Sequence, residues 1–151
     1  MIFIKFLKQL EIITKTIKIG KPVNLQVKRL YWGAPTQTIA DLPAVIATMT
    51  EPERTLGFGS REQIIRVNLQ LMVGKSMPDN STLAEAATVL WFAAKRVFDK
   101  NTSINGTVEW STLRGADPTV PVILQHSGYT YIGFNSYLDI LAYGAFDFGG
   151  A

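Results

Sequence analysis

The sequence has no cysteine and a single histidine, His126, and both shortages restrict the chemistry open to it. Without cysteine there is no disulfide, no thiolate ligand for a metal and no thiol nucleophile. One histidine excludes a metal site built from several histidines. His126 stands next to Ser127 and Gly128, a setting typical of a solvated turn and not of a catalytic triad. We therefore expect neither a metal site nor a cofactor.

Long hydrophobic runs are also missing. No stretch approaches the roughly 18 consecutive apolar residues that a membrane-spanning helix needs. The N-terminal segment MIFIKFLKQLEIITKTIKI begins apolar, but Lys5 and Lys8 interrupt it and no small-residue cleavage site follows. The sequence predicts a soluble, unprocessed protein that does not contact a membrane.

What the chain does contain is typical of one globular domain. Its 151 residues are 47% apolar and 18% charged, with no internal repeat or low-complexity linker, and we treat residues 1–151 as a single domain. The charge is uneven: residues 1–75 carry a net +6 and residues 76–151 a net −3, within an overall +3. This asymmetry indicates complementary faces, suited to self-association or to lying near nucleic acid. The alternative is a chance distribution of surface charge.

Two segments have the apolar spacing of amphipathic helices. In the first, residues 3–19, the apolar stripe repeats at helical spacing, and Gly20 and Pro22 end the helix. The second lies within residues 77–101, with Thr82 and Glu85 at capping-box spacing and Asp79, Asn80 and Ser81 as alternative caps. Each helix carries one apolar residue on its polar face, and these are Ile12 and Phe92.

The remaining segments have the pattern of β-strands. The strongest alternation runs along residues 65–73, where one face is apolar and Arg66, Asn68 and Gln70 share the other. A long final strand over residues 129–146 has one break near Asn135, typical of a bulge or bend. We expect an α+β fold in the order α-β-β-β-α-β-β, with a mostly antiparallel sheet and both helices on one face.

The stretch TLGFGSREQIIRVNLQLMVGK, residues 55–75, invites comparison with a phosphate-binding loop because Gly57 and Gly59 precede Arg61. Such a loop follows a strand and opens a helix, whose N-terminus supplies the amide groups. Here the strand comes after the glycines, so the pattern favours the tip of a hairpin. The acidic residues lie mostly in loops and on outer helix faces, without a paired arrangement for acid–base chemistry. We expect that the protein is not an enzyme.

Five basic residues lie on or near two predicted strands and the loop between them: Lys28, Arg29, Arg54, Arg61 and Arg66. If the two strands are neighbours, these cations form one patch that suits a phosphate backbone without reading its sequence. The alternative is an ordinary solvated face.

The whole arrangement resembles the tail terminator, or tail completion, proteins of long-tailed bacteriophages over roughly residues 3–146. The resemblance lies in the order of elements and not in a signature motif. It comprises the N-terminal helix, a strand ending in RLYWGAP, the strands DLPAVIATM and REQIIRVNLQLMV, the alanine-rich helix LAEAATVLWFAAKRVF, the segment VEWSTLRGADP and a final β pair. Neck and tail-joining proteins look similar at this level.

The resemblance implies a structural virion protein that forms a hexameric ring on the tail tube during assembly in the host cytoplasm. Such a ring ends tube polymerisation, contacts the tube protein and the head-side connector or neck protein, and lets DNA pass through its lumen. The family supplies no catalytic residues. From the residues themselves we expect Ile12, Phe92 and Phe58 at subunit interfaces, and the five basic residues facing the lumen. The alternative is a non-viral basic nucleic-acid-binding module.

Overall fold

A computed structural model of the chain describes residues 3–33, 39–49, 54–55, 62–115 and 121–143. Within these ranges the elements are α1 (Phe3–Thr14), β1 (Lys18–Ile19), β2 (Leu25–Gln26), β3 (Arg29–Trp32), β4 (Ala44–Met49), β5 (Arg54–Thr55), β6 (Glu62–Lys75), α2 (Ser81–Asp99), β7 (Trp110–Gly115), β8 (Val122–His126) and β9 (Tyr129–Tyr143). No described helix has the length and apolar character needed to cross a membrane.

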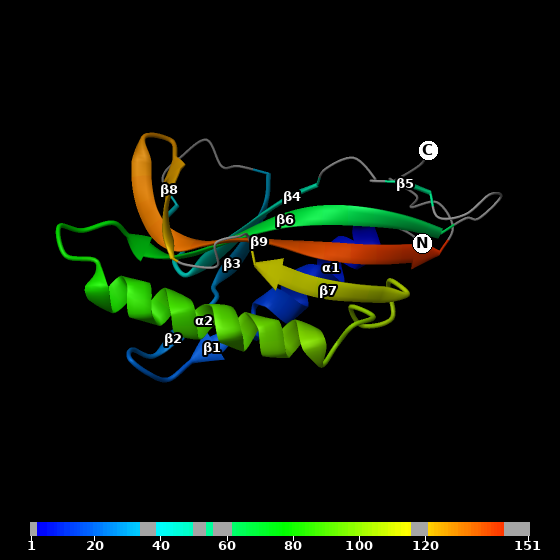
Figure 1. Cartoon of the computed structure of the whole chain (residues 1–151), viewed down its shortest axis with the longest axis horizontal. Helices are drawn as coiled ribbons and strands as arrows, with labels where there is room; N and C mark the ends of the chain where they lie inside the picture. The colour runs from blue at the N-terminus through cyan, green and yellow to red at the C-terminus, as the bar shows by residue number, and fades with distance from the viewer. Residues whose placement is uncertain (1–2, 34–38, 50–53, 56–61, 116–120, 144–151) are drawn as a thin grey trace.

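One sheet organises the molecule, with strand order β3-β4-β6-β9-β7. The short strand β5 adds to β6, and β8 adds to β9. Every pair is antiparallel except β3 and β4, which run parallel, while β1 and β2 form a separate small hairpin. Both helices lie beneath the sheet (Figure 1). The predicted α+β class and mostly antiparallel sheet are confirmed. The structure contains more strands than the predicted order, because it adds the β1–β2 hairpin, β5 and a third strand after α2.

The main core lies between the sheet and the two helices. The alternating apolar residues of β6, Ile65, Val67, Leu69, Leu71 and Val73, are all buried there, as the sequence pattern predicts. The alanines of α2, including Ala87 and Ala94, are buried and bring the helix close to the strands. The helices therefore occupy one face and leave most of the other face open.

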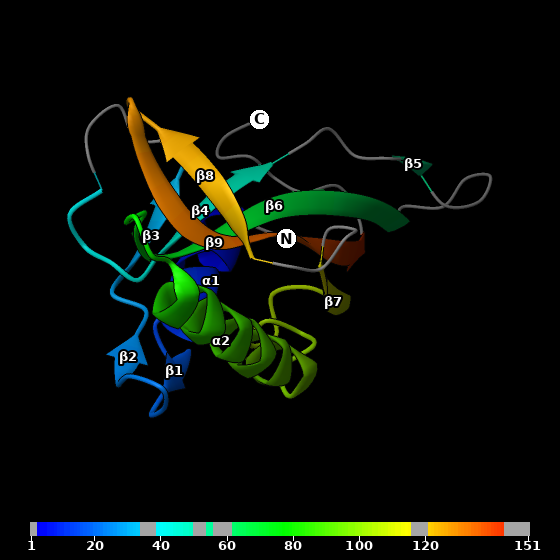
Figure 2. The ribbon, with the colours of Figure 1, turned by 60° about the vertical axis from the view of Figure 1, so that its left-hand side comes forward.

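A second, smaller core covers one end of the opposite face, where β9 bends sharply upward with β8 (Figure 2). It contains Ile39, Ala44, Ile46, Met72, Leu124 and Tyr131. The Tyr131 hydroxyl accepts a hydrogen bond from the Ile39 amide at 3.0 Å. Tyr131 belongs to this second core and its neighbour Ile132 to the main one, because successive side chains of a strand point to opposite faces.

The bend depends on Gly133, and its position corrects the sequence prediction. A bulge or bend was expected near Asn135, but Asn135 pairs regularly with Gln70. The register shifts instead between Met72 and Gly74 on β6, opposite Ile132 and Gly133. A Cβ atom on Gly133 would lie 1.8 Å from the carbonyl oxygen of Leu71, so only glycine allows this close approach of the two strands.

The end of α1 and the start of α2 also differ from the prediction. α1 ends at Thr14 and not near Gly20, because the hydroxyls of Thr14 and Thr16 bond back to the carbonyls of Glu11 and Ile13 and the chain then enters β1. The N-cap of α2 is Asn80, one of the three alternative caps, and not Thr82, since α2 already begins at Ser81. Asp79 instead accepts hydrogen bonds from the amide and hydroxyl of Ser81, which lower the pKa of its carboxyl.

The glycine pair, Gly57 and Gly59, lies outside the described residues. Its flanks are described, and they decide between the two interpretations. β5 pairs antiparallel with β6, with Arg54 opposite Ile64 and Thr55 opposite Gln63. Residues 56–61 therefore join two paired strands, as the hairpin interpretation predicts, and no helix N-terminus follows them.

Candidate functional site

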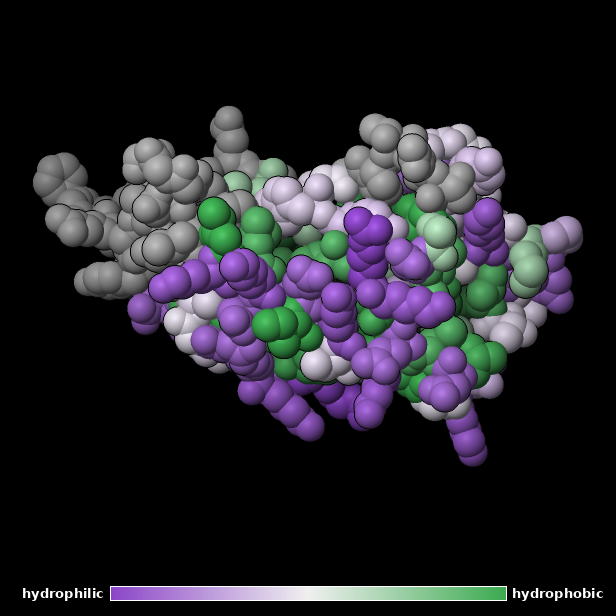
Figure 3. Space-filling view, turned by 180° about the vertical axis from the view of Figure 1, so that it is seen from behind, coloured by the Kyte–Doolittle hydropathy of each residue, from purple (hydrophilic) through white to green (hydrophobic). Residues whose placement is uncertain are grey.

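Two surfaces of the described structure carry features that the core does not explain, and the first is the outer side of the helices. Ile12 in α1 is 53% exposed and Phe92 in α2 is 64% exposed. The outward position expected for both residues is confirmed, while their role in an interface stays a prediction. Phe58, the third expected interface residue, lies outside the described residues. Seen from behind, the molecule shows hydrophobic surface interrupting a largely hydrophilic face (Figure 3).

Phe92 borders an apolar hollow of 250 Å³ between α2 and β9. Its lining consists of Thr88, Trp91, Phe92, Lys95 and Phe134. The Trp91 ring meets Phe134 edge-on, with centroids 6.3 Å apart and an interplanar angle of 83°. Among the described residues, Trp91 Nε1 is the only buried side-chain nitrogen or oxygen without a hydrogen-bond partner. An unpaired buried donor is uncommon and costs stability.

The second surface is the open face of the sheet, opposite the helices. Arg66 on β6 bonds both carboxylate oxygens of Asp139 on β9, at 2.8 and 3.2 Å. Arg114 on β7 reaches the same carboxylate at 3.5 Å. Arg66 also lies over the Tyr137 ring, 4.1 Å from its centroid. Two guanidinium groups share one carboxylate, so this cluster carries a net positive charge.

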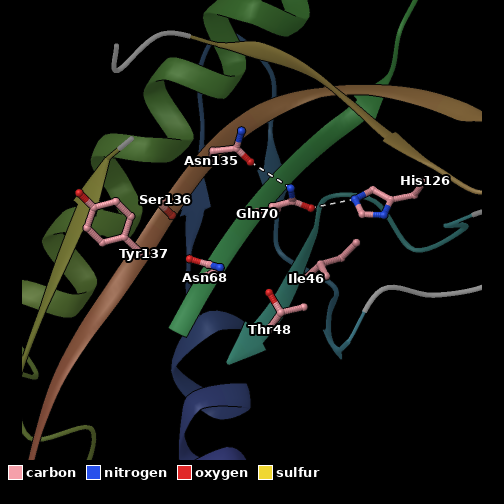
Figure 4. Close-up of a pocket in the computed structure, with 8 residues that line it drawn as sticks. All are labelled: Ile46, Thr48, Asn68, Gln70, His126, Asn135, Ser136 and Tyr137. Atoms are coloured by element: carbon pink, nitrogen blue, oxygen red, sulfur yellow. Dashed lines mark hydrogen bonds between the residues drawn. The ribbon is translucent and has the colours of Figure 1, made fainter. Parts of the chain in front are cut away.

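Beside this cluster the open face contains a polar hollow of 460 Å³, drawn in Figure 4. Gln70 lies at its centre and donates to Asn135 Oδ1 at 3.0 Å. On its other side Gln70 Oε1 lies 2.8 Å from His126 Nε2, which therefore carries the proton in this amide orientation. Asn68 sits between Thr48 and Tyr137 in the cross-strand register. All eight lining residues are uncharged when His126 is neutral.

Partial burial keeps His126 neutral at neutral pH. Desolvation lowers the pKa of its imidazole below the ordinary value of 6.5. The hollow thus presents amide, hydroxyl and imidazole groups that exchange hydrogen bonds with uncharged polar partners. No group of three or more Asp, Glu, His or Cys side chains within the described ranges is arranged to hold a metal ion.

The basic residues predicted to form one patch do not all come together. Their two strands are not neighbours, because β4 separates β3 from β6. Arg29 lies in register with Ala44 and hence with Met72, which is six residues along β6 from Arg66. At the rise of a strand this places Arg29 and Arg66 about 20 Å apart.

Each of the five basic residues has a different setting. Arg29 pairs with Asp41 at 3.6 Å and lies over Tyr31, and Lys28 beside it is exposed. The backbone of Arg54 belongs to β5, and Arg61 lies outside the described residues. Of the three basic residues whose side chains the structure describes, Lys28, Arg29 and Arg66, Arg66 alone belongs to the charged cluster on the open face. The sequence analysis missed its partners Asp139, Arg114 and Tyr137. Tyr137 and Asp139 are two residues apart on β9, and Arg114 of β7 pairs with Tyr137, so all three lie on one face of the sheet.

No protein-family model matches the sequence, and a search of curated proteins finds no significant match. The resemblance to tail terminators therefore remains a prediction from the order of elements.

Proposed function

We propose that the chain is a structural subunit that assembles into a ring at the head-proximal end of a phage tail tube. In this role it ends tube polymerisation and joins the tail to the head-side connector or neck protein. Its partners are further copies of itself, in a hexamer by analogy with tail terminators, together with the tube protein. The proposal assigns it no catalytic activity and places it in the virion.

The observation that carries the proposal is the exposure of Phe92 beside an apolar hollow, together with the exposed Ile4 and Ile12 of α1. A single exposed apolar side chain is common in a monomer, but one that borders an apolar hollow is typical of an interface anchor. Phe92 borders an apolar hollow that a neighbouring chain can fill. Ile12 lies on α1 and Phe92 on α2. Head-to-tail contacts between two different surfaces are the kind from which rings are built.

The open face of the sheet suits the lumen of such a ring. Its cluster of Arg66, Arg114 and Asp139 has a net positive charge, and the neighbouring hollow is polar and uncharged. A surface of this kind attracts a phosphate backbone without holding it at a fixed sequence. DNA that must slide through a ring needs contacts of this weak and shape-blind type.

The test is to combine the pure protein with tail tubes built from the tube protein of the same phage and to image the tubes by electron microscopy. We expect a ring of additional density at one end of each tube and a narrow distribution of tube lengths. Tubes with bare ends and unlimited growth in the presence of the protein would contradict the proposal. Bovine serum albumin at the same concentration is the control for non-specific effects.

A second candidate function, binding of nucleic acid by the free chain, is favoured by the same Arg66–Arg114 cluster. In that case short duplex DNA should bind the monomer, with an affinity that falls steeply as salt increases. Arg114→Ala should weaken this binding, because Arg114 is the more exposed member of the cluster. If no complex forms even at low salt, this candidate function is excluded.

A further inference from the structure

The apolar hollow beside Phe92 has room for a side chain that the described part of the molecule does not supply. Its volume is 250 Å³, and it lies between Trp91 and Phe92 of α2 and Phe134 of β9. A dry apolar cavity of roughly 150 Å³ is enough to hold a benzene ring. One phenyl group therefore fits, against three aromatic walls that favour edge-to-face contacts.

The segment that follows β9 contains such a group in a suitable charge setting. Residues 144–151 read GAFDFGGA, with Asp147 between Phe146 and Phe148. The hollow has one charged residue in its lining, the cation Lys95. Lys95 pairs with Asp99 at 3.0 Å on the exposed side of α2. Exposed pairs of this kind contribute little, so a second carboxylate can join or replace Asp99 at small cost.

This segment begins at the end of β9 that lies away from the hollow. Residues 134–143 of β9 pair with β6 without any shift of register, so Tyr143 lies at most about 30 Å from Phe134 along the strand. Phe148 is five residues beyond Tyr143, and five residues extend over at most about 18 Å. Within one chain, Phe148 approaches the hollow only if its segment runs back along the sheet at full extension, whereas the segment of a second copy has no such restriction.

We propose that the Phe146–Asp147–Phe148 segment of one copy docks in the Phe92 hollow of the next copy. One phenyl ring enters between Trp91 and Phe134, and Asp147 pairs with Lys95 at the rim. The contact joins two different surfaces, so it is head-to-tail and builds a ring or an open chain of subunits. It rests on the proposed self-assembly and identifies the contact that drives it.

The direct test measures binding of a labelled peptide with the sequence YGAFDFGGA to the full-length double variant Phe146→Ala/Phe148→Ala. This variant keeps the hollow but lacks its own phenyl groups, so the peptide meets no competitor. We expect binding in fluorescence anisotropy that weakens at least tenfold when both phenylalanines of the peptide are alanine. Phe92→Asp in the receiving protein should weaken it by a similar factor. Equal binding of both peptides would overturn the proposal.

The proposed pair of Asp147 and Lys95 is tested separately by exchanging the two charges. Lys95→Asp should weaken binding of the unmodified peptide severalfold, and a peptide carrying lysine in place of Asp147 should recover it. A variant that is equally weak with both peptides would contradict the Asp147–Lys95 pair. Circular dichroism of each variant confirms that the fold is intact.

Sedimentation velocity separates this proposal from the proposed function. If Phe92→Asp abolishes assembly and Phe146→Ala/Phe148→Ala leaves it unchanged, the interface at Phe92 stands and the docked segment is wrong. If the peptide binds as described but the wild-type chain forms no ring on tail tubes, the docking stands and the ring function fails.

Discussion

At the scale of single residues, Phe92 is the side chain that we expect to anchor the interface between copies. We predict that Phe92→Asp leaves the monomer folded, because the side chain is 64% exposed and makes little contact with the core. Loss of an interface anchor typically costs about 2 kcal/mol or more, so self-association should weaken about 30-fold. Sedimentation equilibrium measures the change.

Thr82→Asp is the matched control, since it adds the same charge to an exposed position of the same helix about 15 Å away. It should associate like the wild type. Equal association of Phe92→Asp and wild type would mean that Phe92 is exposed without serving an interface.

Leu69 tests which face of β6 belongs to the core. Leu69 is 1% exposed within the main core, so Leu69→Asp places an unpaired carboxylate among apolar side chains. We predict a loss of more than about 4 kcal/mol in the free energy of unfolding, which leaves the variant largely unfolded. Asn68→Asp, on the open face one residue earlier, should remain folded in circular dichroism and urea titration. A folded Leu69→Asp variant would contradict the assigned core.

His126 gives the fold a defined dependence on pH. Burial lowers the pKa of His126 in the folded state below 6.5, so the unfolded chain binds the proton more readily. The stabilising contribution of the neutral imidazole is therefore complete above pH 6.5 and declines as the pH falls towards the lowered folded pKa. In urea titrations, the wild type should lose more stability than His126→Gln between pH 7.5 and pH 5. Identical pH profiles for the two proteins would show that His126 does not contribute.

At the scale of elements, β6 and β9 dominate the structure and Gly133 controls how they meet. A side chain on Gly133 would collide with the backbone of Leu71, which cannot move without breaking the central ladder. We predict that Gly133→Ala lowers the free energy of unfolding by at least about 3 kcal/mol.

Gly20→Ala is the control for this prediction, because a Cβ atom there meets nothing within 4 Å. Its stability should stay within about 0.5 kcal/mol of the wild type in thermal and urea denaturation. A Gly133→Ala variant as stable as Gly20→Ala would mean that the two strands are not in close contact.

The predictable elements are those with a strong, uninterrupted period. The alternation of β6 and the stripe of α2 correctly placed Leu69 in the core and Phe92 in solvent, because each side chain follows the geometry of its own element. The end of α1 was misplaced, because threonine hydroxyls competed for backbone carbonyls within an apolar pattern that continued into β1. The bend at Gly133 was displaced because it depends on a contact with β6, which no local pattern contains.

At the scale of the whole molecule, the two faces of the sheet differ in what covers them. One face is closed by the helices, whose outer sides carry the exposed Ile12 and Phe92, and most of the other remains open and polar. The open-face cluster could not be predicted from the sequence, because Arg66 and Asp139 are 73 residues apart and meet only through strand pairing. The exposed Ile12 and Phe92 could be predicted, because a helical projection alone reveals them. The proposed contact of residues 146–148 joins separate copies, so it belongs to this scale too.

The central claim is that copies of this chain form a closed ring on the end of a tail tube. Native mass spectrometry of the protein bound to short tail tubes, followed by electron microscopy of the same sample, tests it most directly. We predict one closed oligomer per tube, most simply six subunits, seen as a ring that caps a single end. A chain that stays monomeric at high concentration and leaves every tube end bare would contradict the claim.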